Sequence, residues 1–388
     1  MKDKYIIIGA DFAPIENDGV RIVQGKQEEV LDIDIAKIIS DADFSVFNME
    51  APIEYEDMIP LKKDGPRLYI PGGAEKIYQH IGVDLLLLAN NHIMDWGEKG
   101  LFHTMKKLDD MGIAYVGAGK NNKFANQAFC IELKGKKIAF YAVAEKEFSI
   151  ADEDAAGANG FSQRVSNERI KEVKKECDFL IVFYHGGREL YQYPSPEQQE
   201  KCRDMIDYGA DMVICQHSHC VGSTEYYKHG EIYYGQGNFV FGEPDAKICE
   251  YSMLLKISVE DKLVTEMIPI RRSEGKVRLL TVDEKKLFEE TISTLNENIT
   301  KDNFIKENYQ ELSLQAIAPY LYQFAGWPLW AIRMDKLFQR KLIKHVFRRN
   351  ERRLLFLQNV LQCDAHREIV LEGLKQLRRQ SDKKEKRY

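Results

Sequence analysis

Residues that can bind metal ions or transfer protons follow five separate apolar runs of the chain. In chain order they are Asp11, Glu50, Asn91 with His92, His185, and His217 with His219. Ligands of open α/β sheets bind beyond the carboxyl ends of the strands, so we expect these side chains to gather at one sheet edge. Taken singly, such an Asp is more often a turn or cap residue, and such a His a structural one. Five strand ends together predict a site.

The chemistry of this set favours two divalent metal ions. Three imidazoles, two carboxylates and an amide suit Mn²⁺, Fe²⁺, Zn²⁺ or Co²⁺, whereas Ca²⁺ prefers oxygen ligands alone. Six side chains exceed the needs of one tetrahedral zinc ion and are enough for two ions sharing a ligand. Two such ions with two carboxylates leave an excess charge of about +2, which attracts an anionic substrate and acidifies water. Hydrolysis of a phosphate ester by a metal-bound hydroxide is the expected reaction.

The third apolar run supplies two adjacent residues with different predicted roles. Asn91 and His92 are neighbours at a strand exit, where successive side chains point in different directions. We therefore assign Asn91 to a metal ion and His92 to general acid catalysis. Asp95 either hydrogen-bonds His92 or caps a helix that begins near Trp96, and the pattern slightly favours the cap.

Four further residues are candidates for substrate binding or for support of the ligands. Asn48 precedes Glu50 in the same motif, and Arg188 and Glu189 flank His185. Arg188 is either a phosphate clamp or a solvated surface residue. Asn238, in a Gly-Gln-Gly-Asn-Phe sequence, is more typical of a turn-forming residue than of a ligand.

The elements that must position these residues alternate between strands and helices. Nearly continuous apolar runs predict buried strands at Tyr5–Ala10, Phe44–Asn48, Val83–Ala89, Lys137–Ala144, Phe179–His185 and Asp211–His217. Amphipathic segments between them predict an α/β sheet covered by helices. From Glu231 the pattern is of strands alone, which predicts an antiparallel sheet, and from about Val282 it is helical. We divide the chain into a domain at 1–280 and a basic helical region at 281–388.

Bulk composition excludes several classes of protein. The net charge of −6 does not suit a nucleic-acid-binding protein. The first apolar run is too short for a secretory signal, and no stretch is long enough to span a bilayer. The seven cysteines are scattered without a CxxC pair, which favours reduced thiols and a cytoplasmic protein.

The C-terminal segment 327–362 combines apolar residues at near-helical spacing with many Arg and Lys. One interpretation is an amphipathic helix lying on an anionic membrane, which would place the protein peripherally at the inner membrane face. The other, which the pattern favours, is a helical subdomain that packs its apolar stripe on the acidic part of the chain. DNA binding fits least, because no recognition motif accompanies the charge.

Several motifs, in order, resemble the CapA-type capsule (poly-γ-glutamate) synthesis proteins, a branch of the calcineurin-like metallophosphoesterases. The resemblance covers about residues 4–270 and rests on Asn48–Glu50, Leu88–Gly100, His185–Glu189, His217–His219 and Tyr233–Phe241. It implies a four-layer α/β/β/α sandwich with a dinuclear metal site. By resemblance, Glu50 is the bridging carboxylate, His92 is the proton donor, and the remaining ligands are Asp11, Asn91, His185, His217 and His219.

The sequence departs from the family pattern without losing a ligand. Ala10 intervenes between Gly9 and Asp11, Gly187 and Arg188 replace bulkier residues in the His-Gly-Gly-Arg-Glu motif, and Gln216 stands where glycine is common. We therefore expect the catalytic function to be kept and the substrate pocket to differ from that of a typical member.

The predicted function is that of a dinuclear metal-dependent hydrolase in capsule or surface-polymer biosynthesis. Its substrate is expected to be an anionic small molecule or polymer. The same site suits cleavage of an amide, such as a γ-glutamyl linkage, and the sequence does not separate the two reactions. A different alternative is a non-catalytic, membrane-associated assembly factor for capsule or poly-γ-glutamate synthesis.

Overall fold

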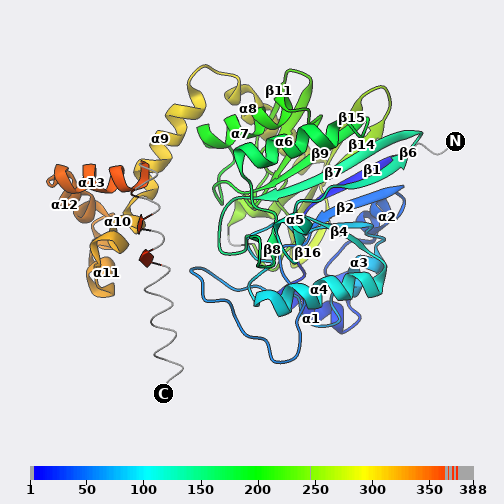
Figure 1. The fold of residues 1–388 in the computed structure, drawn as a ribbon, viewed down its shortest axis with the longest axis horizontal. Helices are drawn as coiled ribbons and strands as arrows, with labels where there is room; N and C mark the ends of the chain where they lie inside the picture. Colours follow the sequence, from blue (N-terminus) through cyan, green and yellow to red (C-terminus); the bar gives the residue numbers. More distant parts are fainter. Residues whose placement is uncertain (1–3, 245, 363–365, 367–368, 371–372, 375–388) are drawn as a thin grey trace. The chain divides into compact units, whose positions relative to one another are not determined.

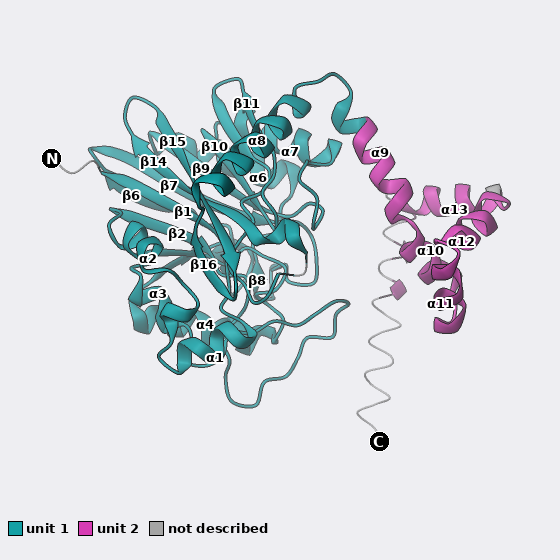
Figure 2. Cartoon of the chain, turned by 180° about the vertical axis from the view of Figure 1, so that it is seen from behind, with its two compact units in different colours: residues 1–306 teal, residues 307–388 magenta. Residues whose placement is uncertain are grey.

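A computed structural model describes residues 4–244, 246–362, 366, 369–370 and 373–374 of the chain. It divides into two compact units, Met1–Lys306 and Glu307–Tyr388 (Figure 2). Every candidate site residue belongs to the first unit, and the segment 327–362 to the second.

The larger sheet of the first unit has eight strands, with β1 at its centre. Parallel pairing joins β1 to β2, β3 and β4 in turn, and antiparallel pairing joins β1 to β14, β15 and β16. β13 also pairs with β1, in parallel. The strands are β1 (Tyr5–Phe12), β2 (Phe44–Asn48), β3 (Leu85–Leu87), β4 (Ala114–Val116), β13 (Asn238–Val240), β14 (Tyr251–Val259), β15 (Leu263–Ser273) and β16 (Lys276–Leu279).

The smaller sheet has six strands in the order β11-β12-β10-β9-β7-β6. These are β6 (Phe129–Leu133), β7 (Lys136–Ala144), β9 (Phe179–His185), β10 (Met212–Gln216), β11 (Thr224–Tyr227) and β12 (Gly230–Tyr233). A short ladder joins β5 (Ala118–Gly119) to β8 (Gly157–Ala158).

The side chains of each strand alternate between the two faces of its sheet, and one face of each sheet packs against the other sheet. In β1, Ile6 and Ile8 enter the core shared with β7 and β9, while Ile7 enters the core beneath the helices on the other face. In β9, Phe183 enters the shared core and Val182 the core beneath a second set of helices. This alternation follows from the two-residue period of a strand. Both faces of each sheet are therefore buried, as the continuous apolar runs predicted.

Helices cover the two outer faces and complete a four-layer α/β/β/α sandwich (Figure 1), which confirms the predicted fold class. The larger sheet is covered by α1 (Glu16–Val23), α2 (Ile33–Ser40), α3 (Lys76–His80) and α4 (Gly97–Met111). The smaller sheet is covered by α6 (Gln163–Lys174) and α7 (Pro196–Asp207). The remaining short helices of this unit are η1 (Gln27–Glu29), α5 (Asn122–Ala125) and η2 (Lys247–Glu250).

The strands after Glu231 differ in part from the antiparallel sheet predicted for them. β14, β15 and β16 are antiparallel to one another, as predicted. However, β12 lies parallel to β10 in the smaller sheet, and β13 lies parallel to β1 in the larger one. An apolar pattern reports that a strand is buried but does not identify its partner, so the pairing was not visible in the sequence.

Helix α8 (Val282–Ile299) belongs to the first unit although it follows the last strand. Thr281 and Glu284 form a reciprocal capping box at its start. Its buried residues Phe288, Ile292 and Leu295 join the core between the sheets. The helical part of the chain thus begins where the sequence indicated, while the compact unit continues to Lys306.

The second unit is helical and has a small core of its own. That core consists of Ala318, Leu321, Tyr322, Ile343 and Phe347. The helices are α9 (Phe304–Ala316), which begins in the first unit, and α10 (Ala318–Ala325), α11 (Leu329–Leu337), α12 (Lys341–Arg348) and α13 (Glu351–Gln362). Among the described residues, no helix combines the length and apolar character needed to cross a bilayer. No disulfide bond involves the six cysteines within the described ranges.

Candidate metal centre

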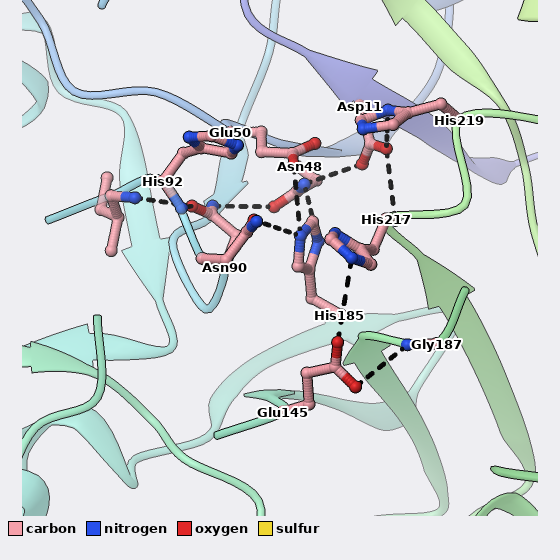
Figure 3. Close-up of polar contacts among 12 residues, drawn as sticks. Asp11, Asn48, Glu50, Asn90, His92, Glu145, His185, Gly187, His217 and His219 are labelled. Atoms are coloured by element: carbon pink, nitrogen blue, oxygen red, sulfur yellow. Dashed lines mark hydrogen bonds and ion pairs between the residues drawn. The ribbon is translucent and has the colours of Figure 1, made fainter. Parts of the chain in front are cut away.

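The predicted metal ligands lie together where strands of both sheets end (Figure 3). From the larger sheet, Asp11 lies in β1, Glu50 follows β2, and Asn91 follows β3. From the smaller sheet, His185 ends β9, and His217 and His219 follow β10. A one-residue irregularity between β1 and β2 accommodates Ala10 and places Asp11 opposite Asn48. The extra residue in the first motif therefore leaves Asp11 at the site.

Glu50 is common to two groups of three possible ligands. One group is Glu50, His185 and His217, and the other is Asp11, Glu50 and His219. Within each group the ligand atoms lie within 4.8 Å of one another. The Oδ1 atom of Asn91 is 3.0 Å from Nε2 of His185, beside the first group. All six residues predicted to bind metal are thus brought together.

Unpartnered buried atoms show that this site fits a cation. Glu50 is fully buried, and no hydrogen bond reaches either of its carboxylate oxygens from the described residues, although Oε1 lies 3.3 Å from Nε2 of His185. The buried Nδ1 atom of His217 is also unpartnered there. A buried polar atom without a partner costs about 1–3 kcal/mol, so such atoms are rare unless a ligand completes them. Carboxylate, imidazole and amide donors together suit a divalent ion.

The local electrostatics favour the neutral, metal-binding form of two of the three imidazoles, His185 and His217. Burial lowers the pKa of His185 to about 4, and burial together with the charges of His185 and His219 lowers the pKa of His217 well below its usual value. Both rings are therefore neutral around pH 7, as metal binding requires. Burial and the neighbouring Asp11 raise the pKa of Glu50. Burial lowers the pKa of His219, but Glu50 and Asp11 outweigh it, so the net shift is upward.

Two asparagines hold the ligands in place. The side-chain amide of Asn48 donates a 2.8 Å hydrogen bond to Asp11 and lies 3.3 Å from Nδ1 of His185. Asn90 donates to the Asn48 side chain and accepts hydrogen bonds from the backbone N–H groups of His92 and Ile93. Asn48 was predicted for a supporting role. Asn90 was not, although it directly follows the same strand as Asn91.

Asp95 contacts His92 and does not cap the following helix. Its Oδ2 atom lies 2.7 Å from Nδ1 of His92. Helix α4 begins at Gly97 with Trp96 in the cap position and no side-chain cap. The preference for a helix cap was therefore wrong, because the imidazole and the backbone N–H of Leu68 occupy the Asp95 carboxylate.

Lys63 completes this cluster from a loop that the sequence analysis did not consider. Its ammonium group forms an ion pair with Asp95 and lies 3.3 Å from Nδ1 of His92, with a side chain only 3% exposed. The backbone N–H groups of Leu61 and Leu68 both donate to Asp95, at 2.7 Å each. The loop is thus held against the site at Asp95. No periodicity or strand end marks Lys63 in the sequence.

Glu145 is a third residue that sequence reasoning missed. It directly follows β7, accepts a hydrogen bond from the backbone N–H of Gly187, and lies 3.8 Å from Nε2 of His217. Burial raises the pKa of Glu145 to about 7. Gly187 has a φ of 108°, and a Cβ atom there would lie 2.6 Å from the Gln198 side chain, which explains the glycine at this position. Its place directly after a predicted strand would have identified Glu145.

The remaining predicted residues are two exposed residues and one partly buried asparagine. Arg188 and Glu189 are exposed, and their charges contribute to the pKa shifts of His217 and His219, respectively. Asn238 begins β13, opposite Asp11, and its Oδ1 atom is 2.8 Å from Nδ1 of His219. Its interpretation as a turn residue was wrong, because Asn238 is the first residue of a strand.

The turn after β10 has an unusual backbone. His217 and His219 have φ values of 92° and 55°, in a region that favours glycine. Residues other than glycine rarely adopt this backbone conformation, which costs on the order of 1–3 kcal/mol. The surrounding structure must therefore hold two imidazoles in a strained turn.

The four-layer sandwich thus carries imidazoles and carboxylates at the strand ends of both sheets. Residues 23–243 match the family described as "Bacterial capsule synthesis protein PGA_cap", and the chain belongs to that family. This confirms the resemblance found in the motifs.

Curated relatives include the capsule biosynthesis protein CapA of Bacillus anthracis, which is 28% identical over 64% of this chain and 62% of its own length. The PGA biosynthesis protein CapA of Bacillus subtilis (strain 168) is 28% identical over 54% of this chain and 56% of its own length. The chain therefore matches less than two thirds of either relative.

Among solved structures, a novel phosphatase from Mycoplasma pneumoniae is 15% identical, with a TM-score of 0.45, covering 70% of this chain and 94% of that one. A putative 5'-nucleotidase from Staphylococcus aureus is 12% identical, with a TM-score of 0.43, covering 74% of this chain and 58% of that one.

Proposed function

We propose that the chain is a metal-dependent hydrolase of phosphate esters that acts in capsule or surface-polymer synthesis. The observation that carries this proposal is the sharing of Glu50, a fully buried carboxylate, by two groups of possible ligands. A carboxylate in that position suits two ions held side by side. Family membership supports the biosynthetic setting.

The proposed ligands are Glu50 between the ions, Asn91, His185 and His217 on one side, and Asp11 and His219 on the other. When bound, two ions such as Mn²⁺, Fe²⁺ or Zn²⁺ supply positive charge that attracts an anionic substrate and increases the acidity of water. Asn48 and Asn238 orient Asp11, His185 and His219 through the contacts described above.

His92 is the proposed general acid of the reaction. Asp95 occupies its Nδ1 atom, so the proton for the leaving oxygen must be carried on Nε2. Asp95 also fixes the orientation of the ring, as carboxylates commonly do for histidines in such sites. Lys63 offsets the charge of Asp95 and ties the surrounding loop to the same carboxylate.

The test is a measurement of bound metal together with hydrolysis. Purified protein is stripped with a chelator, reloaded with Mn²⁺, and assayed with p-nitrophenyl phosphate and bis-p-nitrophenyl phosphate. We expect about two ions per chain and metal-dependent turnover. Two bound ions without turnover of either ester would favour amide hydrolysis over phosphoester chemistry. A failure to bind any metal would overturn the proposal and favour a non-catalytic assembly factor.

A further inference from the structure

The turn between α11 and α12 carries a groove of about 850 Å³ in the second unit. Apolar and basic side chains line it together, among them Leu337, Phe338, Lys341, Leu342, Lys344 and Arg348. We refer to these six residues as the C-terminal basic surface.

The apolar members of this surface are unusually exposed. Leu337 is 76% exposed, Phe338 60% and Leu342 48%. Leu329 and Trp330, at the start of α11, are also exposed. A cluster of exposed apolar side chains in a small helical unit indicates an interaction site rather than a core.

The unit does not need these residues for its own folding. Its core is formed by other residues of α10 and α12. Asp335 joins the helices: it accepts hydrogen bonds from the Tyr322 hydroxyl and from the backbone N–H groups of Leu342 and Ile343. The turn that carries the C-terminal basic surface is therefore fixed from inside. Its exposed apolar side chains are available to a partner, whereas Lys344 also donates a hydrogen bond to the backbone carbonyl of Leu314.

The charge around this surface is almost entirely positive. The segment 329–362 contains nine Lys and Arg against two acidic residues, and one of those two is the buried Asp335. The positive charge is therefore not balanced within the segment. The segment therefore attracts a partner of opposite charge, and this attraction weakens as the ionic strength rises.

We propose that the C-terminal basic surface docks on an anionic phospholipid bilayer. Leucine and phenylalanine side chains enter the boundary between headgroups and acyl chains, and the neighbouring lysine and arginine side chains bind lipid phosphates. No described helix can span a bilayer, so this contact lies at the membrane interface.

The same observations disfavour two other occupants. A second copy of this surface would bring like charges together, which opposes association. A nucleic acid would bind the cations but would gain little from exposed leucines, because its affinity comes mainly from phosphate contacts. Of these three partners, only a bilayer accommodates both the apolar and the basic side chains.

The experiment uses the full chain and co-sedimentation with vesicles. One set of vesicles contains phosphatidylcholine alone, and the other contains about one third phosphatidylglycerol. We expect binding to the anionic vesicles, a marked decrease with added salt, and little binding to the neutral ones.

Matched variants separate the apolar and charged contributions. The double variants Leu337→Glu/Leu342→Glu and Lys341→Glu/Arg348→Glu should each bind anionic vesicles at least about tenfold more weakly. Val282→Glu and Lys99→Glu, at exposed positions of α8 and α4, serve as controls and should bind like the parent. Circular dichroism and thermal unfolding establish that the variants are folded.

Three results would overturn the proposal: no binding of the parent to anionic vesicles, equal binding to neutral vesicles, or unchanged binding by both double variants. Binding to a mixed-sequence oligonucleotide in place of vesicles would favour the nucleic-acid alternative. The metal site takes no part in these measurements, so the outcome is independent of the proposed hydrolase activity.

Discussion

Two fully buried carboxylates of the first unit, Asp18 and Glu50, have opposite surroundings. Asp18, in α1, accepts hydrogen bonds from both terminal nitrogens of Arg272, at 2.7 and 2.8 Å, and from the backbone N–H of Gly242. Glu50 has no hydrogen-bond partner on either oxygen among the described residues. Both side chains are inaccessible to solvent.

The difference separates a structural carboxylate from one that awaits a ligand. Burial of a charge is costly unless a partner compensates it, and Arg272 provides that compensation within the chain for Asp18. Glu50 has no such cation among the described residues: its Oε1 atom lies 3.3 Å from Nε2 of His185, and burial raises its pKa to about 8. Buried acidic residues in this fold are therefore informative about function only when their partners are counted.

Replacing Glu50 with Gln is expected to give the largest effect. Metal content should fall from about two ions per chain to nearly none, and hydrolysis should fall at least about 10³-fold, because both ligand groups lose a member. The free energy of unfolding without metal should stay the same or increase, since an unpartnered buried carboxylate is removed. Elemental analysis and thermal unfolding measure the two quantities. A stable, fully loaded variant would contradict the role of Glu50.

A substitution at His92 tests the proposed catalytic role of a buried side chain that has a hydrogen-bond partner. His92→Ala should lower turnover by about 10²–10⁴-fold, the usual contribution of a general acid. Bound metal should remain nearly unchanged, because His92 is not a proposed ligand. Loss of turnover and metal together, or of neither, would argue against this assignment.

A substitution at Arg272 tests whether the buried ion pair with Asp18 stabilises the fold. Arg272→Met should lower the free energy of unfolding by about 3–5 kcal/mol, because Asp18 is left buried without its cation. Metal content of the folded fraction should not change. In the double variant Asp18→Asn/Arg272→Met much of the loss should be recovered, which chemical denaturation in a double-mutant cycle would measure. Equal losses in the single and double variants would show that the ion pair is not the cause.

Lys63 links the two kinds of site, because it is a buried cation beside the proposed general acid His92 and its partner Asp95. Lys63→Met should lower turnover about tenfold through misplacement of Asp95 and His92, with metal content retained. Limited proteolysis should cut the loop around Lys63 faster than in the parent. Lys99→Met, at an exposed position of α4, is the control. Parent-like cleavage and turnover would remove Lys63 from the site.

Glu284 represents a carboxylate partnered near the surface, where the smallest effect is expected. Hydrogen bonds from Arg278, the Thr281 backbone and Arg271 lower its pKa below the usual 4.5. A lowered acid pKa adds stability above the unfolded-state pKa, and that stability is lost as pH falls. Glu284→Gln should therefore cost about 1–2 kcal/mol near pH 7 and progressively less below about pH 4.5. A pH-independent difference in denaturation midpoint would contradict the ionic origin.

The sequence predicted the layered fold well because burial on both faces leaves a direct record in composition. Strands Phe44–Asn48 and Phe179–His185 have the predicted bounds. The strands that pair with β12 and β13 were not predictable, because strand pairing depends on contacts between residues distant in sequence.

The site was predictable where a side chain able to bind metal or transfer protons follows a strand. Glu145 shows that the same rule, applied to every predicted strand, would have identified further site residues. Lys63 could not be found in this way. It reaches His92 through a loop whose path is set by hydrogen bonds to Asp95, and no local pattern encodes such a path. The choice between the two roles of Asp95 likewise depended on a partner that the sequence does not show.

The strained turn at His217 and His219 has a consequence for how such a chain changes over generations. Glycine would adopt both backbone conformations without the steric cost that histidine bears. If the imidazoles had no function, replacing these histidines with glycine would increase folding stability. Selection for stability alone would therefore favour loss of the site. In this turn, persistence of the two histidines requires continued selection for what they bind.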